Sequence, residues 1–143
     1  MASRHQMTGM LGVYLVAAEL TRNDLIVSIT SRNARGADLL ATDQSYKNTW
    51  SIQVKTNRRP ASFWLLNKSY KEEVADRHIY VFVNLRGDEG PDYYVVPSWH
   101  VAKYGRTTPE RSGGSIWHAY YRADGIDYRD AWTVFTGDLP HSN

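Results

Sequence analysis

The segment of residues 36–56, GADLLATDQSYKNTWSIQVKT, constrains the fold more than any other part of this 143-residue sequence. Two runs of apolar and small residues flank the turn-forming letters DQSYKN, a pattern that predicts a β-hairpin. The arms nevertheless carry polar groups, because Asp38 lies in the first arm and Gln53 and Lys55 lie in the second. Such a hairpin either has one face in water or carries a functional site.

The expected pairing of the two strands brings these polar groups close to one another. Opposed residues of an antiparallel pair have a constant index sum, and a turn centred at residues 44–45 gives a sum near 90. Asp38 then faces residue 52 or 53. Side chains alternate along a strand, so Gln53 and Lys55 share one face. If Asp38 pairs with Gln53, all three groups lie on one patch; a shift of one residue separates them.

The rest of the chain predicts an α/β (α+β) fold with one mixed sheet of about five strands flanked by helices, within a single domain over residues 1–143. The segment after the third strand is typical of a loop or a short helix, and the C-terminal segment has a mixed pattern. The expected elements are a helix over 8–22, strands over 24–30, 37–42, 49–56, 78–85 and 92–97, and a short helix capped by Ser98.

The first helix has a helical apolar pattern and predicted caps at both ends. Thr8 is the expected N-cap, and Asn23 is expected to close the helix in a left-handed conformation. We expect the helix to be well buried along a stripe formed by Leu11, Tyr14, Leu15 and Ala18.

Composition restricts the class of protein. Apolar residues make up 42% of the chain, which argues against disorder. The sequence has no cysteine and no apolar run long enough to span a bilayer, and its N-terminus lacks the layout of a secretory signal, so we expect a soluble cytoplasmic protein. The net charge is only +2, yet residues 47–77 hold seven basic and three acidic residues. This basic segment either contacts a polyanion or is solvated surface.

Glu19 adds a carboxylate to the hairpin's polar groups. It lies among apolar neighbours in VAAEL, where it either faces solvent near the helix end or serves a site. Carboxylates and an amide oxygen are the hard ligands that Mg²⁺ binds in proteins. A nearby lysine can position or deprotonate a water molecule, so Glu19, Asp38, Gln53 and Lys55 together indicate metal-assisted phosphodiester hydrolysis.

This arrangement resembles the PD-(D/E)xK nuclease superfamily, whose members include restriction endonucleases and small Holliday-junction resolvases. The matching features are Glu19 in the first helix, Asp38 at the start of the second strand, and Gln53-Val54-Lys55 in the third. The resemblance covers about residues 8–105 and rests more on the order of elements than on any single residue. The chain departs from the common pattern at Gln53, where the superfamily usually has Glu or Asp.

The resemblance implies a Mg²⁺- or Mn²⁺-dependent nuclease acting on nucleic acid, DNA in preference to RNA. Asp38 would be the central metal ligand, with Glu19 bound directly or through water and Gln53 and the Val54 carbonyl completing the coordination. Lys55 would orient or activate the attacking water. Cleavage of both strands of a duplex would suggest a homodimer. The alternative is a nucleic-acid- or protein-binding module on the same fold with weakened or lost catalysis, which the uncharged Gln53 favours.

Other residues are candidates for binding nucleic acid. Four arginines near the hairpin ends would contact phosphates or only solubilise the loops: Arg32, Arg35, Arg58 and Arg59. Four aromatic residues would stack on unpaired bases or belong to the core: Tyr46, Trp50, Phe63 and Trp64. The five histidines lack a paired metal-binding spacing, which favours structural roles. The aromatic segment 117–132 indicates a third possibility, a surface for protein contacts.

Overall fold

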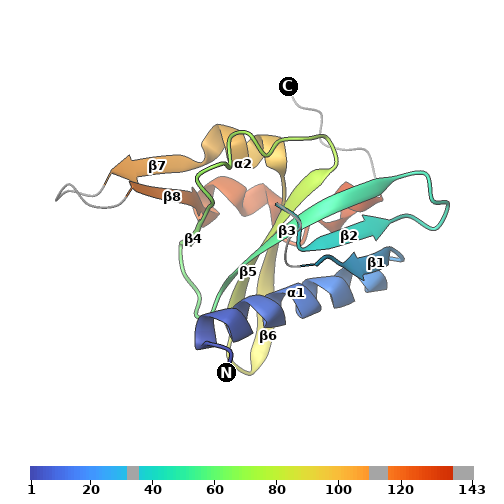
Figure 1. Cartoon of the computed structure of the whole chain (residues 1–143), viewed down its shortest axis with the longest axis horizontal. Coiled ribbons are helices and arrows are strands. Elements are labelled where there is room, and N and C mark those ends of the chain that lie inside the picture. The colour runs from blue at the N-terminus through green and yellow to red at the C-terminus, as the bar shows by residue number, and fades with distance from the viewer. Residues whose placement is uncertain (32–35, 110–115, 137–143) are drawn as a thin grey trace.

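The computed structural model describes residues 1–31, 36–109 and 116–136 (Figure 1). Its elements follow the predicted order through the second helix except for one added strand, β4, and then continue with two further strands and two 3₁₀ helices. The bounds are α1 (Arg4–Arg22), β1 (Ile26–Ile29), β2 (Leu39–Thr42), β3 (Thr49–Asn57), β4 (Phe63–Leu65), β5 (His78–Arg86), β6 (Glu89–Pro97), α2 (Ser98–Tyr104), β7 (Arg106–Pro109), β8 (Ile116–Tyr121), η1 (Arg122–Tyr128) and η2 (Trp132–Phe135).

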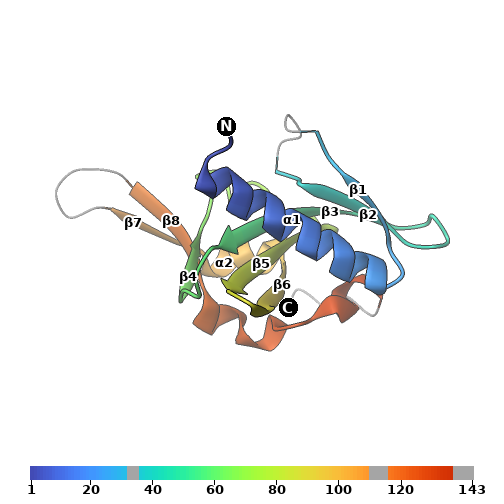
Figure 2. The same cartoon turned by 90° about the horizontal axis from the view of Figure 1, so that it is seen from below.

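The main sheet has five strands in the order β1-β2-β3-β5-β6. All neighbours are antiparallel except β3 and β5, which are parallel, so the predicted mixed sheet is confirmed. The helix α1 lies along one face of this sheet, and α2 lies on the other side (Figures 1 and 2). A second sheet, in the order β4-β8-β7, adds to that side. No helix in the described part of the chain is long and apolar enough to cross a membrane.

The predicted hairpin is formed by β2 and β3. Leu39 pairs with Ile52, which gives an index sum of 91. The backbone N–H of Asp38 donates to the carbonyl of Ile52 at 2.8 Å, an index sum of 90, so the register shifts by one residue just before β2 and Asp38 faces Ile52. The prediction that Asp38 faces residue 52 or 53 is therefore confirmed.

The helix α1 begins earlier than predicted. Ser3 is the N-cap and forms a reciprocal capping box with Gln6, whereas Thr8 lies inside the helix and bonds back to the carbonyl of Arg4. At the other end Asn23 has a φ of −92°, and Asp24 takes the left-handed conformation instead, at 64°.

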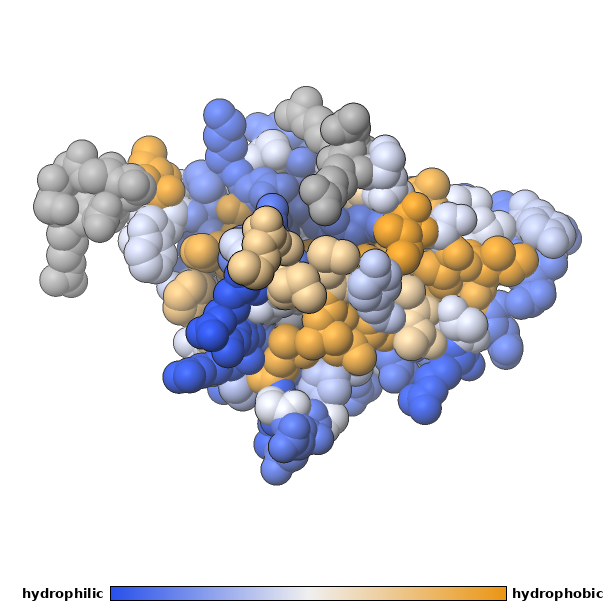
Figure 3. Space-filling model, turned by 60° about the horizontal axis from the view of Figure 1, so that its bottom comes forward, coloured by the Kyte–Doolittle hydropathy of each residue, from blue (hydrophilic) through white to orange (hydrophobic). Residues whose placement is uncertain are grey.

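The buried side of α1 also differs from the predicted stripe. Its buried residues are Gly12, Val16 and Leu20, while Leu11 and Tyr14 are exposed. Several apolar side chains of α1 are thus on the molecular surface, and Figure 3 shows hydrophobic side chains on the face that carries the helix. A nearly continuous apolar sequence could not show which side meets the sheet. The small Gly12 decides it, because it lets the helix approach β3 closely.

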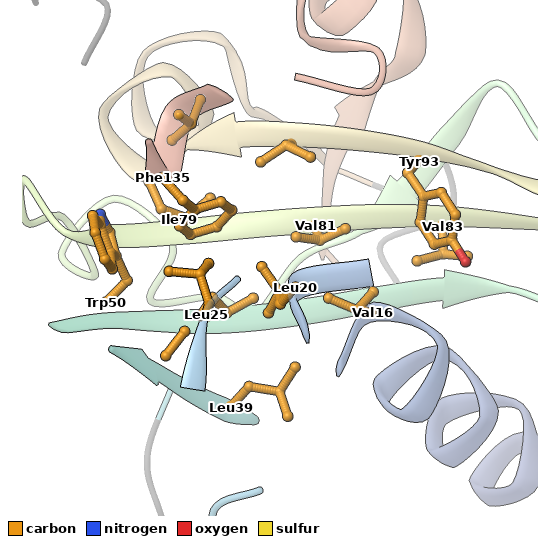
Figure 4. Packing of buried hydrophobic residues seen from close by; sticks show 14 residues of the cluster. Val16, Leu20, Leu25, Leu39, Trp50, Ile79, Val81, Val83, Tyr93 and Phe135 are labelled. Atoms are coloured by element: carbon orange, nitrogen blue, oxygen red, sulfur yellow. The ribbon is translucent and has the colours of Figure 1, made fainter. Parts of the chain in front are cut away.

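The core between α1 and the main sheet is aliphatic. Val16 and Leu20 of the helix meet branched side chains of β2, β3 and β5, and Trp50 and Phe135 close one end edge to face at 5.6 Å (Figure 4). A Cβ on Gly12 would collide with the side chain of Thr56, which shows how near the helix lies to β3. This packing fixes which side of β3 faces the helix.

The core on the opposite face is aromatic. Phe82 of β5 stacks on Tyr120 of β8 at 4.7 Å, and Trp64 of β4 packs on Phe82 at 5.1 Å. The segment predicted as a loop or short helix thus contains the strand β4 followed by turns. Ser98, expected as the cap of α2, uses its hydroxyl instead to bond both the N–H and the carbonyl of Ala75. These two bonds tie the segment before β5 to the start of α2.

Candidate active site

The strand β3 has a different environment on each side. Ile52, Val54 and Thr56 face α1 and belong to or border the aliphatic core. Gln53 and Lys55 point the other way, because side chains alternate along a strand. In the parallel register Gln53 lies beside Tyr80 of the aromatic core. Two of the predicted site residues therefore lie on the sheet face opposite α1.

Asp38 lies where β2 begins and is held by β3. Its Oδ2 accepts the backbone N–H of Val54 at 2.8 Å. In an extended strand the carbonyl of a residue points to the same side as its N–H. The Val54 carbonyl therefore faces the same side as Asp38, as the predicted coordination requires. The structure thus brings the Asp38 carboxylate to the backbone of Val54, the residue that follows Gln53.

Lys55 lies on the same sheet face as Gln53, near enough to Asp38 for the two charges to interact. Its ammonium donates to the Asn67 side chain at 3.1 Å. Burial lowers the pKa of Lys55, and the neighbouring carboxylates of Asp38 and Glu73 oppose part of that shift. An amine that loses its proton more readily than usual is suited to orient or deprotonate a water molecule.

Gln53 is a buried residue with an unused acceptor. Only 5% of it is exposed, and its Oε1 has no hydrogen-bond partner among the described residues. Leaving a buried acceptor unpaired costs about 1–3 kcal/mol. A buried oxygen without a hydrogen-bond donor is free to bind a metal ion. An amide oxygen, together with a carboxylate and a backbone carbonyl, is a ligand type that suits a hard divalent cation. The residues present therefore fit Mg²⁺ or Mn²⁺.

Glu19 does not join these residues. It forms an ion pair with Arg22 at 3.2 Å. Burial raises the pKa of Tyr93 to about 12, and the Glu19 carboxylate adds to that rise. Tyr93 belongs to β6, the edge strand farthest from β1, and two strands, β3 and β5, lie between β6 and β2.

Other residues of α1 face Asp38. A pocket beside Asp38 and Val54 is lined from the helix by Gln6, Gly9, Met10, Val13 and Tyr14. Glu19 follows Met10 by nine residues, which turns it to the opposite side of the helix and places it ~13 Å further along the axis. It is the only acidic residue of α1, so the helix brings no carboxylate to the pocket.

A carboxylate that sequence reasoning missed lies nearby instead. Glu73 precedes β5, and its charge acts on Lys55 as well as on His78 and Tyr80. A Cβ on Gly36 would lie 3.5 Å from its carboxyl carbon. The letters KEEVADR are typical of a solvated loop, and 34 residues lie between Asp38 and Glu73. No spacing rule in the sequence connects them.

Histidines are also present in this region and elsewhere. His78 bonds Ser51 through Nδ1 at 2.6 Å, and its Nε2 is buried without a partner among the described residues. His100 bonds the hydroxyl of Tyr120 at 3.0 Å inside the aromatic region. Within residues 1–31, 36–109 and 116–136, no three His, Cys, Asp or Glu side chains are grouped to hold a metal ion. A cation beside Asp38 therefore needs the Gln53 amide or a backbone carbonyl.

The predicted phosphate-binding arginines divide into two groups. Arg58 and Arg59 are exposed immediately after β3, three and four residues beyond Lys55. The side chain of Asn57 anchors this turn by donating to the carbonyl of Phe63 at 2.8 Å and to Asn84 at 3.0 Å. Arg32 and Arg35 lie outside the described residues.

The predicted stacking residues have unequal exposure. Trp50 and Trp64 are buried in the two cores, so neither is available to a base. Phe63 packs against Trp117 and Tyr121. Tyr46, in the β2–β3 turn, is 76% exposed. Only Tyr46 of the four has a freely accessible ring.

The fold is similar to those of two nucleases of known structure. The bacterial homing endonuclease I-Ssp6803I shares 17% identity at a TM-score of 0.58, over 94% of this chain and 92% of that chain. Hjc, a Holliday junction resolvase from Archaeoglobus fulgidus, shares 11% identity at a TM-score of 0.51, over 82% of this chain and 87% of that chain. Neither a protein-family model nor a curated protein matches the sequence. The chain has a restriction-endonuclease-like fold, with a five-stranded mixed sheet flanked by helices.

Proposed function

We propose that this protein is a metal-dependent nuclease of the Gln-x-Lys variant that hydrolyses phosphodiester bonds, with DNA as the favoured substrate. One observation carries the proposal: the buried, unpaired Oε1 of Gln53 lies on the same sheet face as Lys55 and next in the chain to Val54, whose N–H binds Asp38. The nuclease structures of similar fold support it by analogy. The protein would work in the cytoplasm, and it would act as a homodimer if it cuts both strands of a duplex.

The proposed roles follow from the chemistry of each group. Asp38, the Gln53 oxygen and the Val54 carbonyl would hold Mg²⁺ or Mn²⁺, which supplies Lewis-acid stabilisation of the phosphate charge. Asp38 is fixed for this role by the Val54 N–H. Lys55 orients the attacking water and takes or shares its proton, a role suited to its lowered pKa.

Arg58 and Arg59 would contact the phosphate backbone. They are exposed at the end of the strand that carries Lys55, where a backbone passing the site would run. Arg32 and Arg35 stay part of the proposal because of their place in the sequence before Asp38.

A cleavage assay tests the proposal. The purified protein is incubated with duplex, single-stranded and branched DNA and with RNA, in Mg²⁺, in Mn²⁺ and in a chelator. We expect cleavage of at least one DNA form that stops in the chelator and in Asp38→Ala. Absence of cleavage of every form would contradict the nuclease, and cleavage that survives both Asp38→Ala and Lys55→Ala would contradict the site.

A binding module on the same fold is the second candidate. Two observations favour it: Gln53 brings no negative charge to the site, and the described residues hold no group of three His, Cys, Asp or Glu ligands. Calorimetric titration separates the two functions. A protein that binds DNA but takes up no Mg²⁺ or Mn²⁺ at millimolar concentration would be the module.

A further inference from the structure

The site described above holds one acidic ligand, Asp38, beside the neutral Gln53. An amide oxygen carries no formal charge, so a single carboxylate would bind a divalent cation weakly. The helix α1 supplies no second carboxylate, because its only acidic residue, Glu19, lies beside Arg22 and Tyr93. A second negative group must come from another element for the cation to be held well.

Glu73 lies where this second negative group is needed. It acts electrostatically on Lys55, and it lies against Gly36, two residues before Asp38. Its Oε2 lies 3.5 Å from the hydroxyl of Tyr80, the residue paired with Gln53 across β3 and β5. Glu73 is therefore near Lys55, near the backbone that leads into Asp38 and near the strand neighbour of Gln53, although it belongs to a segment far from them in sequence.

The segment that carries Glu73 is held firmly. Tyr70 is almost completely buried in the aromatic core. Ser69 donates to Glu73 Oε1 at 2.9 Å and its carbonyl accepts the backbone N–H of Glu73 at 3.2 Å. Asn67 of the same segment accepts from Lys55. The fold thus places two groups of this segment over the sheet face that carries Gln53: Asn67, which accepts a hydrogen bond from Lys55, and the carboxylate of Glu73.

A separate observation points to a ligand at this place. Gln53 is 5% exposed and its Oε1 is unpaired, on the face that Tyr80 and Glu73 border. We propose that Glu73 supplies the second carboxylate of the divalent-cation site, in place of the helix carboxylate that the sequence suggested. This inference rests on the proposed function, and it assigns to residues 66–77 a role in cation binding beyond packing.

Binding of Mn²⁺, measured by calorimetry without nucleic acid, tests the inference. The variants are Glu73→Gln, Glu73→Asp, Asp38→Asn and, as a matched control, Glu72→Gln, which removes the same charge from an exposed neighbour. We expect at least a tenfold weaker affinity in Glu73→Gln and in Asp38→Asn, and less than a twofold change in Glu72→Gln. Glu73→Asp should also weaken binding, because its shorter side chain withdraws the oxygens.

Each other outcome is decisive. If Glu73→Gln behaves like Glu72→Gln while Asp38→Asn loses binding, Glu73 is not a ligand and the proposed nuclease stands. If Glu73→Asp keeps full affinity while Glu73→Gln loses it, Glu73 acts only as a nearby charge and the inference fails. If the unaltered protein binds no Mn²⁺, both the inference and the metal-dependent nuclease fail.

A measurement on the unaltered protein covers the case in which the Glu73 variants do not fold. Paramagnetic Mn²⁺ broadens the NMR signals of the nuclei nearest to it. We expect substoichiometric Mn²⁺ to broaden the amide signals of Asp38 and Glu73 before those of Glu19 and Glu72. Broadening at Asp38 with an unaffected Glu73 would overturn the inference.

Discussion

The two sides of β3 show how one strand can serve stability and chemistry at once. The side toward α1 carries Ile52 and Val54 in an aliphatic core, with Thr56 pressed against the helix. The other side carries Gln53 and Lys55 among polar neighbours. The first side is filled by hydrophobic packing, which requires only suitable volume and shape. The second side keeps charged and unpaired groups that reduce stability.

A buried side-chain oxygen without a partner occurs on each side. Thr56 Oγ1 and Gln53 Oε1 are both buried without a hydrogen-bond partner among the described residues. A buried unpaired oxygen is unfavourable wherever it lies. If the two sides have different roles, removing one oxygen should affect function and removing the other should affect only stability. Substitutions along β3 and the elements that contact it can therefore test the comparison.

Lys55→Ala should have the largest effect. Loss of the group that orients the water is expected to lower the cleavage rate by about 100- to 1000-fold, without loss of folding. Single-turnover cleavage with circular dichroism as a folding check measures both. The exposed Lys68→Ala is the control, and it should cleave at nearly the unaltered rate. Equal loss in both variants would show that general charge, and not the site, drives cleavage.

Gly12→Ala tests the packed side. The added methyl would collide with Thr56, so we expect a loss of unfolding free energy of about 2–3 kcal/mol in urea. Gly9→Ala is the matched control, because a Cβ there meets nothing within 4 Å. It should stabilise the helix by up to ~1 kcal/mol. If Gly12→Ala were as stable as Gly9→Ala, the close approach of α1 to β3 would be wrong.

The hairpin and the main sheet could be predicted because local pattern determines them. The alternation around Ile52 and the turn letters before it set the register to within one residue. The helix face could not be predicted, because Leu11 and Tyr14 are as apolar as the buried residues and only the contact between Gly12 and Thr56 selects the side.

The candidate site was predictable in part for a similar reason. Asp38, Gln53 and Lys55 belong to one hairpin, so pairing arithmetic relates them. The position of Glu19 depends on the rotation of α1 about its axis, which the apolar pattern left open. Glu73 reaches the site only through the packing of Tyr70 and the fold of residues 66–77, a tertiary arrangement that no local pattern records.

Gln53→Leu should separate stability from function on the polar side. It removes the unpaired oxygen, so we expect the free energy of unfolding to rise by ~1 kcal/mol. The same change removes a proposed ligand, so Mn²⁺ affinity should fall about tenfold. Urea unfolding and calorimetry measure the two effects. A variant that is less stable and binds Mn²⁺ normally would show that Gln53 is structural.

Thr56→Val should have the smallest effect and completes the comparison. Valine has nearly the shape of threonine, so the substitution removes the unpaired Oγ1 without opening a cavity or adding volume beside Gly12. We expect the free energy of unfolding to rise by up to ~1 kcal/mol, as in Gln53→Leu. Mn²⁺ affinity and cleavage rate should stay unchanged, because Thr56 faces the helix. If Thr56→Val weakened Mn²⁺ binding as much as Gln53→Leu, the two sides of β3 would not have separate roles, and the unpaired oxygen of Gln53 would no longer mark a ligand site.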